Sequence, residues 1–169
     1  MTKEKPAMPD PEKLSAGALT IATLEDEIRV DRLCVEMIRT FGNAISARTG
    51  QRPERVGRLC HGADYFLREF VIADRRENLL QISGRRIRQF GGHWYIVKTL
   101  EPNMTELGSI LDGIAAFYPY LAERAIIDRE RAADICAACA EREWYRQRIE
   151  AFWAIEGDGY FAWRDEVPL

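Results

Sequence analysis

The sequence lacks the short motifs that mark familiar enzymes. It has no G-x-G-x-x-G or G-x-x-x-x-G-K-[ST] loop for phosphates, no H-E-x-x-H zinc helix and no G-x-S-x-G nucleophile turn. Serine is scarce, and no serine has a histidine nearby in the sequence. We therefore expect a protein that acts by binding rather than by catalysis, although these absences alone do not decide whether it is an enzyme.

Histidine is even scarcer, because only His61 and His93 are present. A ferritin-like di-metal site requires Glu-x-x-His pairs. The residues three positions before the two histidines are Arg58 and Phe90. This excludes the di-metal class in its usual form, and we predict no cofactor.

Long apolar runs are missing as well. No window approaches the roughly 20 apolar residues that a membrane-spanning helix requires, and the first residues contain charges without the apolar core of a signal peptide. We expect a small, bacterial-type cytoplasmic protein without a membrane partner. In that compartment the four cysteines would stay reduced.

What is present is the composition of one folded helical domain. The chain has 169 residues, of which 47% are hydrophobic and 30% charged, and helix-forming Leu, Ala, Arg and Glu are plentiful. Pro6, Pro9 and Pro11 break the start of the chain. We predict a flexible tail over residues 1–20 and a single helical domain over residues 21–169.

Apolar residues spaced by three, four and seven positions predict the helices. The predicted segments are 23–48, a helix beginning at Pro53, 103–127, and 128–153. Their expected N-caps are Thr23 with Asp26, Asn103 or Thr105, and Asp128. The aromatic end, with Tyr160, Phe161 and Trp163, should fold back onto the body or dock on a second subunit. The predicted fold is an all-α antiparallel bundle of four to five helices with an N-terminal tail and an aromatic C-terminal arm.

The segment from Ser83 to Lys98 has two interpretations. It can be a helix, with Ile87, Phe90 and Trp94 at helical spacing. Alternatively, Gly91-Gly92 can form the turn of a short β-hairpin between residues 86 and 99. We favour the helix because the flanking segments are helical and an isolated hairpin is only marginally stable.

Charge is unevenly distributed, although the net charge is only −3. Residues 52–98 hold ten Lys and Arg against five Asp and Glu, and residues 99–169 hold seven against fourteen. A basic surface with interleaved aromatics would suit nucleic acid. The candidate binding residues are Arg75, Arg76, Arg85, Arg86, Arg88, Trp94 and Tyr95, together with Lys98. The simpler interpretation is a solvated face whose charges the acidic part neutralises, and we favour it.

Two of the cysteines form a C-x-x-C pair, Cys136 and Cys139. On a helix both sulfurs lie on one face, and Cys60 and His61 could complete a tetrahedral zinc site. We favour buried structural cysteines, because the pair lies in an alanine-rich apolar stripe. A metal or thiol-redox protein is therefore the third hypothesis.

The run from Ser109 to Ile127 resembles helices in the core-binding modules of tyrosine recombinases, which often read F..YL...G.I at a helix end. The likeness covers this one helix, and no recombinase catalytic domain follows it, so no residue role is transferred. The leading hypothesis is a protein–protein interaction or regulatory accessory module that could form a homodimer. Nucleic-acid binding is the second hypothesis.

Overall fold

The protein is built from helices joined by short connections. The computed structural model describes residues 14–48 and 50–167, and these residues contain no strand, which confirms the all-α prediction. Within the same ranges, none of the helices is both long enough and apolar enough to cross a bilayer. The elements are η1 (Ala16–Leu19), α1 (Leu24–Ser46), α2 (Pro53–Asp64), η2 (Tyr65–Asp74), α3 (Gly84–Gln89), η3 (Phe90–Trp94), α4 (Tyr95–Lys98), α5 (Met104–Glu123), α6 (Arg129–Cys139), α7 (Arg142–Trp153) and α8 (Tyr160–Asp165).

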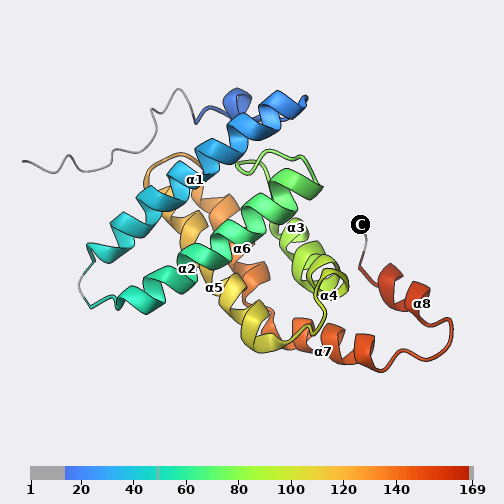
Figure 1. The fold of residues 1–169 in the computed structure, drawn as a ribbon. Coiled ribbons are helices and arrows are strands. Elements are labelled where there is room, and N and C mark those ends of the chain that lie inside the picture. Colours follow the sequence, from blue (N-terminus) through green and yellow to red (C-terminus); the bar gives the residue numbers. More distant parts are fainter. Residues whose placement is uncertain (1–13, 49, 168–169) are drawn as a thin grey trace, which may run out of the picture.

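The helices pack in layers around α2. Figure 1 shows α1 lying along α2, with α5 and α6 behind this pair. The π-helical segment η2 continues α2 without a break, and α3, η3 and α4 likewise form one continuous helical segment. Helix α7 runs along the lower edge in this view and leads to α8, which forms the end of the described chain (Figure 1).

Several helix starts follow the predicted signals. Thr23 and Asp26 form a reciprocal capping box at the start of α1, and Pro53 occupies the first turn of α2. The side chain of Asn103 accepts the Glu106 N–H at 2.8 Å, and that of Asp128 accepts the Arg131 N–H at 2.7 Å. Each cap satisfies a backbone donor that has no partner inside its helix.

The prediction of four to five helices does not hold for the described residues, because they form seven continuous helices besides the η1 turn. The segment predicted as one helix over 128–153 is broken at Ala140 and Glu141, where Glu141 has a non-helical ψ of 48°. The break turns the small residues of α6 towards α3 and α5, while the aromatic residues of α7 contact η3. One straight helix could not make both sets of contacts.

The hairpin alternative is wrong for the described segment, because Gly91 and Gly92 lie inside the helical turn η3. A Cβ added to Gly91 would lie 2.8 Å from the Tyr145 ring, and one added to Gly92 would lie 2.5 Å from the Trp144 ring. These glycines therefore allow two aromatic rings of α7 to pack directly on the backbone of η3. In a hairpin turn the two glycines would be needed because glycine adopts positive φ values. In this helix they are needed because glycine has no side chain to clash with the rings.

The centre of the fold is an unusually close contact between α2 and α5. A Cβ added to Gly113 would lie 2.4 Å from the Leu59 carbonyl oxygen and 2.7 Å from the Ala63 nitrogen. A Cβ added to Gly62 would lie 2.8 Å from the Ile110 Cα. The two backbones touch at this crossing, which is possible only because a glycine lies on each side.

The end of the predicted tail belongs to the packed body. Leu14 is 5% exposed and Leu19 is fully buried within the hydrophobic core. Asn78 holds this segment by donating from Nδ2 to the Ala16 carbonyl at 2.5 Å. Apolar side chains thus order residues 14–19, while residues 1–13 of the predicted tail lie outside the described residues.

Candidate functional site

The arginines of the basic segment are mostly occupied by carboxylates from other elements. Arg88 forms a two-pronged ion pair with Glu141, at 2.9 and 2.7 Å. Arg86 binds Glu77 in the same manner, with an Nε–Oε2 distance of 2.8 Å. Such bidentate pairs are the stronger kind of surface ion pair. The acidic and basic parts of the chain therefore do meet at Arg88, whereas Glu77 belongs to the basic part itself.

The remaining arginines do not converge on one surface. Arg76 lies 3.5 Å from Glu27 of α1, and Arg75 lies 3.5 Å from Asp74 while its guanidinium covers the Phe70 ring. Arg85 is exposed and has no ion-pair partner among the described residues.

The aromatic residues of the same segment form core rather than a binding face. Trp94 is 9% exposed and packs on Phe70 of η2, and Tyr95 is fully buried with its ring against Phe90. Phe90 is also fully buried and contacts both Phe66 and Phe70. Bases could not stack on rings in these positions. The nucleic-acid hypothesis stays a prediction that this geometry does not favour.

The cysteines do not assemble with His61. Cys60 faces α1, where its sulfur would lie 2.9 Å from a Cβ on Gly42, whereas the Cys136 thiol donates to the Ala115 carbonyl of α5 at 3.5 Å. Within residues 14–48 and 50–167, no three His, Cys, Asp or Glu side chains lie close enough to hold a metal ion. The geometry therefore offers no support for a zinc site of Cys60, His61, Cys136 and Cys139.

The thiols are also in environments that oppose redox chemistry. Burial raises the pKa of Cys139 to about 12, and burial likewise raises the pKa values of Cys60 and Cys136. The thiolate is the reactive form of cysteine. Burial disfavours this form at all three positions, although only Cys139 is buried and Cys60 and Cys136 are half-buried.

The C-terminal arm is anchored on the body by one buried ring. Trp163 of α8 is 4% exposed, and its Nε1 donates to the Arg148 carbonyl of α7 at 3.0 Å. The Arg148 guanidinium lies 4.2 Å from the centre of the Trp163 ring, and the His93 ring stacks on the same tryptophan at 5.4 Å. The arm thus folds back onto its own chain, which was one of the two predicted outcomes.

The anchor contains two polar groups in an unusually buried position. Arg148 is 3% exposed, donates from Nε to the Gly92 carbonyl at 2.9 Å and pairs through Nη1 with Glu166 at 3.0 Å. His93 is 8% exposed, and its Nδ1 has no hydrogen-bond partner in the described structure. Burial, followed by the positive charges of Arg148, Arg75 and Arg164, lowers the pKa of His93. The imidazole is therefore held neutral beneath the arm.

Two large aromatic side chains beside the anchor, one at the end of α7 and one in α8, are exposed. Trp153 at the end of α7 is 58% exposed, and Phe161 of α8 is 59% exposed. Both rings belong to the aromatic cluster of the anchor, because Trp153 contacts Phe152 and Phe161 contacts Tyr160. We call Trp153 and Phe161 the aromatic face of the arm. It is the candidate interaction site.

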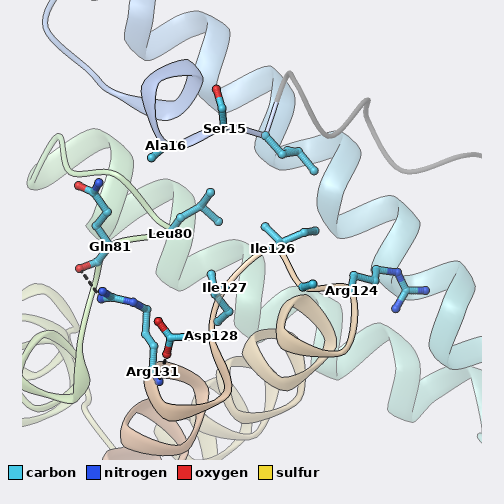
Figure 2. A pocket seen from close by; sticks show the side chains of 11 residues that line it. Ser15, Ala16, Leu80, Gln81, Arg124, Ile126, Ile127, Asp128 and Arg131 are labelled. Atoms are coloured by element: carbon cyan, nitrogen blue, oxygen red, sulfur yellow. Dashed lines mark hydrogen bonds between the residues drawn. The ribbon is translucent and has the colours of Figure 1, made fainter.

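A separate pocket of about 870 Å³ lies between the N-terminal segment and the turn that joins α5 to α6. Figure 2 shows Leu80, Ile126 and Ile127 along it, with Arg131 bonded to the Gln81 carbonyl at 2.9 Å. Its charged groups have roles inside the fold, since Asp128 caps α6 and Arg124 lies 3.8 Å from the Tyr120 ring centre. The charged side chains of this pocket therefore hold neighbouring elements of the fold together, and we do not assign them to a ligand.

A second cavity, of about 910 Å³, is more polar and lies between α2, the end of α4, α5 and α7. We call it the polar pocket. The side chains that line it with charged or titratable groups are Arg58, His61, Tyr65, Lys98, Glu106, Asp112 and Arg142. The sequence suggested a binding role for two residues of this set, His61 in a zinc site and Lys98 in the basic segment. The others come from separate segments without a shared motif.

Comparison with known proteins identifies no relative. No protein-family model matches the chain, and neither the curated proteins nor the solved structures contain a match.

Proposed function

We propose that this protein is a protein–protein interaction module that binds its partner through the aromatic face of the C-terminal arm. The observation that carries the proposal is the exposure of Trp153 and Phe161, at 58% and 59%, on an arm whose neighbouring Trp163 is buried. Tryptophan and other aromatic residues dominate the binding energy of many protein interfaces. Exposed large rings are costly in water unless a partner covers them.

The anchored arm favours binding because it presents these rings in a fixed arrangement. The Trp163–Arg148 hydrogen bond and the stacked His93 ring hold α8 before any partner arrives. A partner that meets a pre-ordered surface loses less conformational entropy on binding than one that must order a free tail.

The charge around the aromatic face indicates the chemistry of the partner. Between residues 150 and 166 the chain has five acidic residues and one basic residue, Arg164. Glu166 and Asp165 already pair with Arg148 and Arg164, whereas Glu156 and Asp158 are exposed and have no cation partner among the described residues. Acidic groups beside aromatic rings suit a partner surface that carries arginine or lysine, through ion pairs and cation–π contacts.

A photo-crosslinking amino acid placed at position 153 tests the proposal in cells of the source organism. The crosslinked protein is identified by mass spectrometry, purified, and titrated against wild-type protein, Trp153→Ala and Phe161→Ala. We expect each substitution to weaken binding by about tenfold or more, as for interface hot spots. Leu100→Ala is the matched control, because Leu100 is 96% exposed but lies outside the arm.

If the double variant Trp153→Ala/Phe161→Ala bound the partner as tightly as the wild type, the aromatic face would not be the binding site. Sedimentation of the purified protein tests the predicted homodimer separately, since self-association lost in the double variant would make a second copy the partner. A cytoplasmic location is part of this proposal, because the four cysteines are free.

A further inference from the structure

We propose that the polar pocket binds the phosphate group of a small phosphorylated ligand. The cavity of about 910 Å³ falls within the size range of ligand sites. Five elements contribute to its wall, namely α2, η2, α4, α5 and α7, and the pocket is distinct from the arm. Binding of a small ligand would therefore be a second activity beside the proposed interaction.

The first argument is the state of the cations in the pocket. Arg58 of α2 and Lys98 of α4 are exposed, and neither has a carboxylate partner among the described residues. By contrast, Arg86 and Arg88 on the basic segment are neutralised by Glu77 and Glu141. Within this cavity, positive charge is thus available to a ligand rather than used to hold the fold.

The second argument is the rigid wall behind these cations. Arg142 donates to the Gly108 carbonyl at 2.8 Å, to the Cys139 carbonyl at 2.7 Å and to Asp112 at 2.7 Å. One guanidinium therefore ties α5 and the end of α6 together and neutralises Asp112. Because Arg142 is bound to these groups, Arg58 and Lys98 are the two cations that remain to bind a ligand.

The third argument concerns the charge of the ligand. Arg58 and Lys98 come from different elements, and the first turn of the 20-residue helix α5 also borders the cavity, at Asn103 and Thr105. Glu106 lies in that first turn and offsets the positive end of the helix, so the two separate cations carry the preference for an anion with two charges over one with a single charge. A phosphate monoester has this charge near neutral pH.

The inner side of the pocket limits what can be bound there. Tyr65 is partly buried against Phe90 and Trp94, at ring-centre distances of 6.3 and 6.1 Å. Burial, together with the nearby carboxylate of Glu106, raises the pKa of Tyr65, which keeps its hydroxyl protonated. A protonated hydroxyl can donate a hydrogen bond to an anion, whereas the exposed Glu106 side chain repels one.

Calorimetric titration of the full chain with inorganic phosphate, at constant ionic strength, tests the proposal. We expect saturable binding at about millimolar concentration or tighter, and weaker binding of acetate. Arg58→Gln and Lys98→Gln should each raise the dissociation constant about tenfold, because each removes a charge-assisted bond. Arg55→Gln is the matched control, because Arg55 is exposed on the same helix but does not line the cavity.

Three results would overturn the proposal. These are the absence of saturable binding of phosphate by the wild type, equal binding of acetate and phosphate, and an equal loss in the Arg55→Gln control. Circular dichroism of every variant separates a loss of the site from a loss of the fold. Because all three substituted side chains are exposed, we expect the fold to persist.

Discussion

Two contacts in this molecule are packed in opposite ways. One joins α2 to α5, and the other joins the C-terminal arm to the body. At the first, Gly62 and Gly113 remove side chains so that two backbones touch. At the second, Trp163 inserts a large ring against His93 and Arg148. The first contact has no freedom to adjust, whereas the second depends on a few side chains of one short helix.

The difference indicates which part of the molecule can move. Separating α2 from α5 would open the hydrophobic core, so that contact should break only when the whole protein unfolds. The helix α8 has six residues and follows a connection in which Gly157 has a φ of 59°. Its release exposes the Trp163 site but leaves the rest of the core intact, so it should occur at lower free energy.

The largest effect should come from filling the close contact between α2 and α5. Gly113→Ala would place a carbon 2.4 Å from the Leu59 carbonyl oxygen, and backbone atoms of two helices cannot easily yield. We expect a loss of about 3 kcal/mol or more in the free energy of unfolding, measured by urea denaturation.

The matched control is Gly57→Ala on the exposed side of α2. An added Cβ there meets no atom within 4 Å, so the substitution should stabilise the helix by about 0.5–1 kcal/mol. A Gly113→Ala protein as stable as the wild type would show that α2 and α5 can separate without cost, contrary to the comparison.

The next effect should be local to the arm. Trp163→Ala removes the buried ring of α8 and should increase the rate of tryptic cleavage after Arg164 by about a hundredfold. The thermal midpoint of the body should change much less, because the main core does not depend on this ring. Trp153→Ala, which removes an exposed ring without a contact to Arg164, should leave the cleavage rate nearly unchanged.

A smaller effect should follow pH through His93. Its pKa is lowered by burial and by the surrounding arginines, so the docked state binds fewer protons than the released state. Stability of the docked arm should be fully present above the ordinary histidine pKa of about 6.5 and decrease as pH falls below that value.

Tryptic cleavage after Arg164, measured between pH 7.5 and 5.5, checks this sign. We expect faster cleavage at the acidic end in the wild type, after correction for the activity of trypsin on an unfolded peptide. His93→Phe keeps a ring against Trp163 but cannot bind a proton, so it should lose the pH dependence. A variant that retained the full dependence would exclude His93 as its source.

Local patterns in the sequence were sufficient for the helices and their starts. The Thr23 capping box, Pro53 and the caps at Asn103 and Asp128 were all readable, because each acts within one turn of its own helix. The break at Ala140 was missed because the helical pattern continues across it.

Contacts between distant segments determined what the sequence left open. Arg88 and Glu141 are 53 positions apart, and Arg148 and the Gly92 carbonyl are 56 apart, so no local pattern relates them. The basic run therefore resembled a nucleic-acid surface until its partners were known. Likewise, Arg58 and Lys98 carry no motif, and only the tertiary structure places them in one cavity.

The sequence by itself thus determined an all-helical chain with an aromatic end, because hydrophobic periodicity and capping are local properties. Only the tertiary structure decided that Gly91-Gly92 supports aromatic rings inside a helix and that the arm docks on its own body. It also decided which cations remain without a carboxylate. These outcomes depend on the distance between side chains far apart in the sequence, which packing alone sets.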